Sequence, residues 1–587
     1  MTKTFKCICV LIGLFCTVNS LLPQKGAGHV NAESEEVRGI WVATVFSLDY
    51  PANPSPSPDT LKAQADNLLN NIQSLGYNTL FFQVRPSGDA FYPSKIFPWS
   101  KYLTGNGGQS PLNGFDPLEY LITQSHKRGI TFHAWINPYR ITASADDIQT
   151  LPESSIAKTH PHLIIKHTDG KLYLNPGEPE ANQLVVDGIG EILKNYNVDG
   201  IHIDDYFYPD SSFPDSETFT KHGGQFSDIG DWRRSNTTNL IKSISSMLKS
   251  THPKVVFSVS PCGVWANKES HPDGSQTKGV QAYFDYYADT RQWVKDALID
   301  WIIPQIYWNI GNSAADFETV AKWWNSAVSG TKVSLCIGQG LYKASDETSS
   351  ASVWYGESGI AELNQQFRLI SSLENCIGYS HYRLGSVLKS QALTDFVKSA
   401  NSGELPLFLD LPSYSWAEDA ITSLHKKGVV NGMGDGTFGC ARQVNRADFT
   451  LMLVRILGKT AEVKDNFEDV SPDQYFYKEI GVAKALGITN GRDGKIFDPT
   501  GNITRQDMAT LVYRLLENEH KLNYDEKFNL SSKFSDVTNI SEYALTSIKT
   551  MVNMGLLNGY ETGEFKPDGF ATRAETAVFL HKVSELL

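Results

Sequence analysis

Residues 199–209 read DGIHIDDYFYP, an apolar run that ends in two adjacent carboxylates and then in aromatic residues. Apolar and polar residues alternate from Ile201 to Asp204, as in a half-buried strand, so His202 and Asp204 are expected to share one face. Asp205 then lies just past the end of the strand. Carboxylates at the carboxyl end of a strand line the active face of a parallel barrel, whereas the alternative for such a pair is a turn or a helix cap. The pattern of the surrounding chain favours the barrel.

Strand-like runs alternate with amphipathic helical runs on both sides of this stretch. Eight strands are expected, at residues 39–47, 79–85, 131–137, 199–205, 255–261, 301–307, 332–338 and 376–382. The helical runs between and after them cover residues 59–75, 117–128, 179–196, 232–249, 315–327, 360–373 and 390–400. Strands separated by helices require a parallel sheet, so the pattern predicts an α/β fold, a (β/α)8 TIM barrel with enlarged loops. A doubly wound open sheet is the alternative, and it fits less well because no GxGxxG turn follows the first strand.

Composition and the amino-terminal residues narrow the choice of environment and partner. The net charge of −13 and the lack of a Lys/Arg block argue against nucleic acid, which requires concentrated positive charge. Lys3 and Lys6 precede an apolar run at residues 7–18, and residues 30–32 offer a small-x-small cleavage site, so residues 1–32 are predicted to be a secretory signal peptide. No later apolar run reaches the roughly 20 residues that span a bilayer. We therefore predict a secreted chain without a membrane span.

Four cysteines remain after such a cleavage, and they are scattered without a CxxC motif. This spacing indicates neither a zinc site nor a dense disulfide framework, although one disulfide stays possible outside the cell. No other cluster has metal-ligand spacing, so we predict no metal and no cofactor.

Polar and aromatic residues gather after the ends of the predicted strands, where a barrel builds its site. Aromatic faces pack against the C–H faces of sugar rings, while amides, Arg and carboxylates bind hydroxyl groups, so this set is typical of a carbohydrate cleft. The predicted substrate-binding residues are Arg85, His133, Trp135, Asn137, Arg140, His202, Tyr206, Trp265, Gln305, Tyr307, Trp308 and Tyr382.

A different pattern begins after a polar linker at residues 401–412. Three blocks repeat, at residues 408–463, 464–530 and 531–587, and each contains a glycine followed 18 residues later by an arginine: Gly428 and Arg446, Gly487 and Arg505, Gly555 and Arg573. Repeats of this regularity predict a mainly α-helical three-repeat module. Each Arg falls in a first helical turn, where the helix dipole disfavours a cation, so the three are predicted to meet an anionic ligand or an interdomain partner.

The motifs resemble two known families. EVRGIWVATVFSLDYP, FFQVRPSGDAFYPS, GITFHAWINPYR, GIHIDDYFYP, YADTRQWVKD and IIPQIYWN resemble the glycosyl hydrolase-like family 10 proteins of bacteria, over residues 35–400. NRAD, TRQD and TRAE resemble the TRAE signature of S-layer homology (SLH) domains, with Asn445 in place of Thr in the first repeat and Gln506 in place of Ala in the second.

The first resemblance implies a TIM-barrel glycosidase in residues 33–400 that acts outside the cytoplasm, with peptidoglycan glycan strands as the substrate class. The second implies attachment to a pyruvylated secondary cell-wall polymer, hence the cell wall or S-layer of a Gram-positive-type envelope. Arg446, Arg505 and Arg573 carry over as polymer-binding residues, together with Trp416.

Glycosidic bonds generally need a carboxylic acid to protonate the leaving oxygen and a second group to meet the oxocarbenium charge. Asp204 and Asp205 are the predicted core of that machinery. In one scheme a second acid from another strand completes the pair, with Asp89 the first candidate and Asp289 a weaker one. In the other, the acetamido carbonyl of the substrate attacks, Asp204 orients it and Asp205 protonates the leaving group. DGIHIDD is similar to the DGxDxDxE strand of family 18 chitinases, which use the second scheme, but His202 and Tyr206 replace two acids of that pattern.

Three function classes follow. The first is a wall-anchored glycosidase. The second is a carbohydrate-binding surface protein on a barrel that has lost catalysis, suggested by the missing glutamate of that strand. The third is a structural S-layer subunit, which the polar strand ends of the barrel argue against.

Overall fold

The amino-terminal part of the protein is a closed ring of eight parallel strands. The computed structural model describes residues 36–433, 436–525 and 527–587, so the predicted signal peptide, residues 1–32, lies outside the described residues. The strands pair in the order β1-β10-β9-β8-β7-β6-β3-β2. They are β1 (Val37–Val42), β2 (Thr79–Arg85), β3 (Thr131–Ile136), β6 (Gly200–Ile203), β7 (Val256–Val259), β8 (Trp301–Ile302), β9 (Ser334–Gly340) and β10 (Cys376–Tyr382). The predicted TIM barrel is confirmed.

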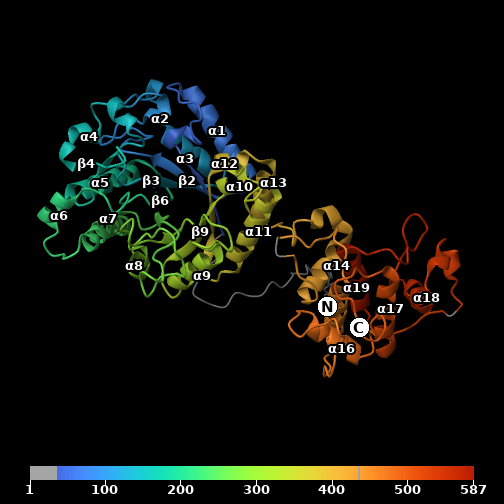
Figure 1. The fold of residues 1–587 in the computed structure, drawn as a ribbon. Helices are drawn as coiled ribbons and strands as arrows, with labels where there is room; N and C mark the ends of the chain where they lie inside the picture. The colour runs from blue at the N-terminus through green and yellow to red at the C-terminus, as the bar shows by residue number, and fades with distance from the viewer. Residues whose placement is uncertain (1–35, 434–435, 526) are drawn as a thin grey trace, which may run out of the picture.

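Helices surround the ring (Figure 1). The main ones are α1 (Pro58–Ser74), α3 (Pro117–Lys127), α5 (Pro179–Asn195), α7 (Ile229–Thr251), α8 (Thr290–Lys295), α9 (Phe317–Val328), α11 (Gly356–Ser372) and α13 (Gln391–Ser402). Shorter elements enlarge the loops: α2 (Lys101–Thr104), α4 (Ile156–Thr159), α6 (Ser216–His222), α10 (Tyr342–Asp346), α12 (Leu384–Leu388) and the antiparallel hairpin of β4 (Ile164–Lys166) and β5 (Leu172–Leu174). The pattern of the sequence did not predict the hairpin or α8.

Two layers of side chains hold the barrel together. Alternate residues of a strand point to opposite faces, so Phe82 joins the large core between strands and helices while Phe81 faces the inside of the ring. Inside, Phe81 packs in a smaller cluster with Trp41 and Trp135. The interior is therefore a packed core, and the open surface for chemistry lies at its carboxyl rim.

Strand β8 is shorter than predicted. It ends at Ile302, whereas the sequence suggested residues 301–307. Pro304 has no N–H group to donate to a ladder, which interrupts the strand. Pairing resumes at Gln305, which bridges to Cys262 on one side and to Gly338 on the other, so the ring stays closed up to the rim.

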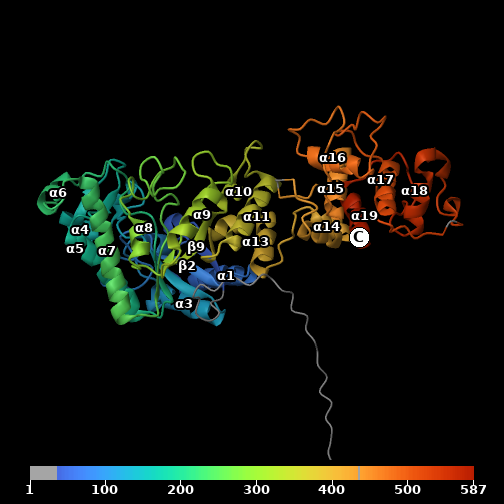
Figure 2. The ribbon, with the colours of Figure 1, turned by 90° about the horizontal axis from the view of Figure 1, so that it is seen from below.

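The carboxyl-terminal part is helical and has its own hydrophobic core. It appears beside the barrel as a separate body in two perpendicular views (Figures 1 and 2). Its helices come in three pairs: α14 (Ser415–Lys426) and α15 (Arg446–Leu457), α16 (Tyr477–Ala485) and α17 (Arg505–Asn518), α18 (Glu542–Asn553) and α19 (Arg573–Ser584). Across the described ranges, no helix combines the length and the apolar character needed to cross a membrane.

Candidate active site

The first carboxylate of the site, Asp204, lies directly beyond β6 and is 3% exposed. Trp135 Nε1 donates to one of its oxygens at 3.0 Å, and Asn137 Nδ2 lies 3.2 Å from each oxygen. These donors come from the end of β3, which pairs with β6. Burial raises the pKa of Asp204 above its ordinary value, while the charge of Arg140 and the two donors oppose that rise. Since both donor groups can only donate, they favour the ionised carboxylate.

The second carboxylate, Asp205, is half-buried at the rim. Burial, followed by the negative charge of Asp204, raises the pKa of Asp205 to about 7. A hydrogen bond with Gln305 and the charge of Arg140 act in the opposite direction. Two neighbouring buried carboxyl groups cannot both ionise easily, so near neutral pH the pair keeps a proton, and the donors around Asp204 direct that proton to Asp205.

Arg140 supplies the positive charge of the site. Its Nε and Nη2 atoms donate to the backbone carbonyl of Pro86 at 3.0 and 2.6 Å, which fixes the guanidinium over the loop after β2. The guanidinium also lies 5.2 Å from the centre of the Tyr206 ring. Its charge favours ionisation of both Asp204 and Asp205.

Tyrosine rings form one wall beside Asp205. Tyr307 and Tyr382 stack with ring centres 6.0 Å apart, and Tyr342 meets both of them edge-on at 6.0 and 6.2 Å. Tyr206 stands at the rim and is 52% exposed. The charge of Asp205 is the largest cause of the raised pKa of the Tyr206 phenol, so ring and carboxyl are close neighbours. Stacked and exposed rings next to an acid suit a sugar that lies flat on the wall.

Two residues near Asp205 were not among the predicted site residues. Burial raises the pKa of the Cys262 thiol and of the Tyr286 phenol to about 12, and the charge of Asp205 adds to both rises. Cys262 directly follows the predicted strand at residues 255–261, so its position could have identified it. Tyr286 lies in the long loop before α8, where the sequence carries no such signal. In the described parts of the chain, no three His, Cys, Asp or Glu side chains could hold a metal ion together.

The two predicted histidines lie below the rim, inside the barrel. His202 Nε2 accepts hydrogen bonds from Trp41 Nε1 at 3.1 Å and from the Ser260 hydroxyl at 3.0 Å, and its Nδ1 lies 2.8 Å from the Ser258 hydroxyl. His133 stacks on the Trp301 ring, and burial lowers its pKa to about 4. Both are buried, so they differ from the prediction: they pack beneath the carboxylates and do not face the cleft.

Arg85 also lies away from the cleft. The register of the β2–β3 pair shifts between Gln83 and Arg85, and the Arg85 guanidinium sits 3.9 Å from the centre of the Phe97 ring. A Cβ atom on Gly188 of α5 would approach Arg85 Nη1 to 2.6 Å, so Arg85 points outward between strand and helix.

Trp265 and Trp308 occupy supporting positions. Trp265 is buried, stacks on Trp323 and donates from Nε1 to Asp289 at 3.2 Å. Asp289 caps the amino end of α8 and accepts from Gln292 N, so its hydrogen bonds stabilise the loop and the start of this helix. Trp308 is half-buried, and its carbonyl accepts a hydrogen bond from Gln366.

Asp89 lies in a hollow of its own after β2. It accepts from Ser87 N at 3.0 Å and from the Ser100 hydroxyl, and burial raises its pKa. The charge of Arg140 lowers the pKa of Asp89 as well as that of Asp204.

The three predicted arginines of the repeats connect one repeat to the next. Each Nε donates at 2.9 Å to a backbone carbonyl of the following repeat: Arg446 to Phe497, Arg505 to Phe565 and Arg573 to Phe438. The third contact returns to the first repeat and closes a ring. The arginines were predicted to meet either an anionic ligand or an interdomain partner. The structure shows a partner in the next repeat for each of them.

Exposed aromatic side chains lie near the junctions between the repeats. Trp416, Tyr475 and Tyr543 stand at the same position of each repeat, and they are 58%, 67% and 56% exposed. Tyr475 donates to Asp448 and Tyr543 donates to Asp507, both at 2.7 Å. The charge of Arg573 acts on Tyr475, and that of Arg446 acts on Tyr543. Each of these two junctions thus combines an acid, an aromatic ring and an arginine from three different repeats.

Comparisons with known proteins agree with this division. Residues 36–356 match the family Glycosyl hydrolase-like 10, and residues 407–450, 466–509 and 533–577 match the S-layer homology domain. The chain is 42% identical over 367 residues to the glycosyl hydrolase YngK of Bacillus subtilis, covering 61% of this chain and 70% of that protein.

The chain is also 38% identical over 405 residues to the glycosyl hydrolase DigH of Escherichia coli K12, covering 64% of this chain and 92% of that protein. Among solved structures, the glycoside hydrolase domain of PgaB from Bordetella bronchiseptica aligns with a TM-score of 0.41 at 14% identity, over 62% of this chain and 98% of that domain.

Proposed function

Because the chain belongs to the glycosyl hydrolase-like 10 family and carries three S-layer homology domains, we propose that it is a secreted, wall-anchored glycoside hydrolase that cleaves peptidoglycan glycan strands. Its enzyme class follows from relatives named glycosyl hydrolases that are 42% and 38% identical over most of the barrel. Its association with the cell surface follows from the three SLH matches. The substrate and the signal peptide are part of the proposal.

The observation that carries the proposal is the unequal pair of adjacent carboxyl groups. Asp204 is surrounded by donors that favour its ionised form, while the pKa of Asp205 is raised to about 7. Glycoside hydrolysis requires such a division, with one group that gives a proton and another that stays negative. The tyrosine wall beside Asp205 provides a surface for the sugar ring.

The positions of the other acids favour the substrate-assisted scheme. Asp89 is hydrogen-bonded within a separate hollow, and Asp289 caps a helix, so neither completes a second pair with Asp205. In this scheme the acetamido carbonyl oxygen attacks C1 while Asp204 accepts a hydrogen bond from the acetamido N–H. The bond from C1 to the leaving oxygen breaks, and that oxygen takes the proton of Asp205. Water then attacks C1, the bond between C1 and the acetamido oxygen breaks so that the acetamido group is restored, and Asp205 takes a proton from the attacking water.

The anchoring part of the proposal rests on the junctions between repeats. A pyruvylated polymer presents a carboxylate on a sugar ring, and the junctions at Tyr475 and Tyr543 each offer an arginine near an exposed aromatic ring. Arg446, Arg505 and Arg573 lie at these junctions, with Tyr543 and Tyr475 beside the first and last of them. Trp416 occupies the equivalent position in the first repeat.

The test is digestion of peptide-free peptidoglycan glycan strands by the full chain, with products identified by mass spectrometry. Asp204→Asn and Asp205→Asn should each lose about 100-fold or more in kcat, as expected when a catalytic acid or base is removed. Asp289→Asn is the matched control, because Asp289 is another partly buried carboxylate whose pKa is raised, and it should keep its activity.

Cleavage that survives both Asp204→Asn and Asp205→Asn would refute the assignment of the carboxyl pair. Failure of the parent to cleave these strands, chitin oligosaccharides and other wall glycans would favour the carbohydrate-binding protein instead.

A further inference from the structure

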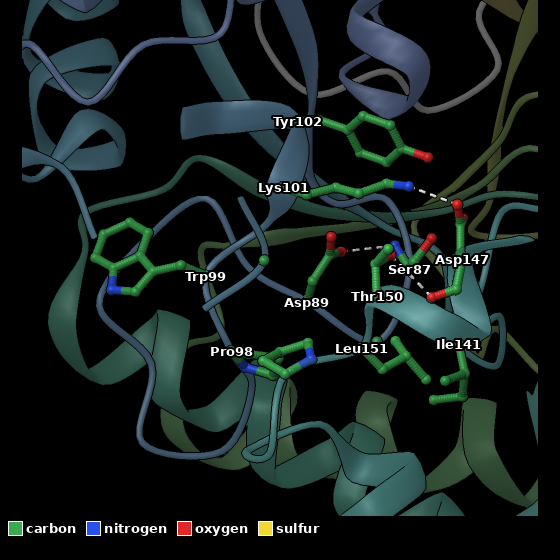
Figure 3. A pocket seen from close by; sticks show the side chains of 13 residues that line it. Ser87, Asp89, Pro98, Trp99, Lys101, Tyr102, Ile141, Asp147, Thr150 and Leu151 are labelled. Atoms are coloured by element: carbon green, nitrogen blue, oxygen red, sulfur yellow. Dashed lines mark hydrogen bonds and ion pairs between the residues drawn. The ribbon is translucent and has the colours of Figure 1, made fainter. Parts of the chain in front are cut away.

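A hollow beside the active site has unused hydrogen-bonding groups. It lies between the loop after β2, helix α2 and the loop after β3, and it contains about 410 Å³ of space, part of it open to solvent. Figure 3 shows Ser87, Asp89 and Thr150 at its centre, with Lys101 and Tyr102 on one side and Pro98, Leu151 and Ile141 on the other. Its mixture of apolar walls with a few polar groups is typical of a small-molecule site.

Two hydroxyl groups in the hollow have no hydrogen-bond partner among the residues that the structure describes. The Ser87 and Tyr102 side chains are 5% and 8% exposed, and neither Ser87 Oγ nor Tyr102 Oη makes a hydrogen bond. A buried hydroxyl without a partner is costly, so native proteins leave few of them. Asp89 also lines the hollow, and its carboxylate accepts hydrogen bonds from Ser87 N and from the Ser100 hydroxyl. These three groups can receive a ligand that both donates and accepts.

Lys101 and Asp147, two of the charged residues that line the hollow, are paired with each other. Lys101 Nζ lies 2.5 Å from Asp147, which also accepts from Ala143 N, Ser144 N and the Ser144 hydroxyl. This ion pair therefore holds the loop after β3 and carries no surplus charge. The available groups are hydroxyls and one carboxylate, which match the hydroxyl groups of a sugar better than a charged peptide.

The hollow is linked to the catalytic carboxylates through Arg140. The Arg140 guanidinium donates to the carbonyl of Pro86, the residue before Ser87 of the hollow. The Arg140 backbone N–H donates at 3.0 Å to Asn137, whose amide in turn lies 3.2 Å from both oxygens of Asp204. A glycan chain that places one sugar over the carboxyl pair would therefore extend past Arg140 towards the hollow.

We propose that this hollow is a second sugar subsite, in which Ser87, Tyr102 and Asp89 bind the hydroxyl groups of an uncharged sugar unit that flanks the cleaved bond. The inference rests on the proposed function, since it needs a glycan substrate. It also gives Asp89 a role in binding and specificity in place of catalysis.

The test compares two double variants of the full chain. Ser87→Ala with Tyr102→Phe removes both unpartnered hydroxyls of the hollow. Ser125→Ala with Tyr92→Phe is the matched control, because these hydroxyls are also buried without a partner but lie outside the hollow. Each double variant loses one serine hydroxyl and one tyrosine hydroxyl, so the two should change in thermal stability by similar amounts.

Activity is measured on peptide-free glycan strands of two, four, six and eight sugar units. In the parent and the control, kcat/KM should rise with chain length until the hollow is filled. The hollow variant should lose about 10-fold on the longest strands, the scale of one or two neutral hydrogen bonds, and change less than about twofold on the shortest strand that is cut. Equal behaviour of the two double variants at every length would overturn the proposal.

A binding measurement separates this proposal from the proposed function. If the parent cleaves none of the strands, the same proteins are titrated with the eight-unit strand by calorimetry. Binding that weakens about 10-fold in the hollow variant alone would support the subsite without catalysis. No binding by the parent, or equal binding by both double variants, would overturn it.

Discussion

Replacing Asp205 by Asn should make the protein more stable at pH 8, although it lowers kcat about 100-fold or more. The pKa of this carboxyl is about 7 in the folded protein against 3.8 for the ordinary group. The folded state therefore keeps a proton that the unfolded state has lost, and stability falls as pH rises from about 4 to about 7. Above pH 7 the parent holds a charged Asp205 beside Asp204, whereas the amide of Asn carries no charge.

The size of the effect follows from the difference between the two pKa values. About three pKa units at about 1.36 kcal/mol each give an upper limit of about 4 kcal/mol. Water reaches part of the half-buried Asp205 side chain, which reduces the penalty to roughly 2 kcal/mol. With an unfolding entropy of about 2.1 cal/mol/K per residue, that corresponds to a rise of about 3 °C in the Tm of a barrel of this length.

The assay is calorimetric unfolding of the barrel transition at pH 5 and at pH 8. The gain from Asp205→Asn should be present at pH 8 and smaller at pH 5. Asp210→Asn is a control that should lower stability. Burial raises the pKa of Asp210, but hydrogen bonds from Ser212 outweigh burial and hold that pKa below its ordinary value. A variant at Asp205 that is less stable than the parent at pH 8, or that gains equally at both pH values, would refute the reasoning.

Other predictions follow from the same contacts. The kcat of the parent should fall about tenfold per pH unit above about pH 7 as Asp205 loses its proton, which a pH–rate profile on soluble glycan measures. Trp135→Phe removes a donor to the ionised carboxylate and should lower kcat about 10-fold or more in the same assay, with little change in KM. Deletion of residues 408–587 should abolish sedimentation with purified cell walls and leave kcat on soluble glycan unchanged, whereas loss of both would contradict two separate modules. Arg573→Ala should destabilise the helical module by about 2 kcal/mol in calorimetry, while the exposed Arg442→Ala should not.

The sequence predicts the strands well where local chemistry determines them. Strands β2 (Thr79–Arg85) and β10 (Cys376–Tyr382) begin and end at the predicted residues. Both are apolar runs with β-branched and aromatic residues, which suit a buried strand. The same reasoning locates Asp204 and Asp205 at a strand end. Where a proline interrupts the run, as in β8, the predicted end is too late.

The depth of a side chain in the barrel could not be predicted in this way. Period-two alternation puts His202 and Asp204 on one face, and both do point into the ring. It does not tell which of them reaches the rim, because that depends on how neighbouring strands are staggered. His202 stops one layer below and bonds to Trp41. A register shift within the β2–β3 pair likewise turns Arg85 outward, and no pattern in the sequence reports it.

The contacts of loop residues could not be predicted from the sequence either. Trp265 follows a strand end as a sugar-binding residue would, yet its indole N–H meets Asp289, 24 residues further along the chain. Tyr286, in the same long loop, approaches Asp205 although nothing in its surroundings in the sequence sets it apart. Such pairs are determined by the path of the loop in three dimensions, which depends on tertiary packing.

The helical module provides a partner from the next repeat for each of the three arginines, which bears on the proposed anchoring. A cation in a first helical turn is disfavoured by the helix dipole, but each guanidinium donates to a backbone carbonyl of the next repeat, which offsets that cost. Arg446 bonds to repeat two, Arg505 to repeat three and Arg573 to repeat one, so every repeat both gives and receives one contact. A single repeat would expose an unpaired arginine and an unpaired loop. The junctions at Tyr475 and Tyr543 each draw an acid, a ring and an arginine from all three repeats, so removing one repeat should abolish wall binding as completely as removing all of them.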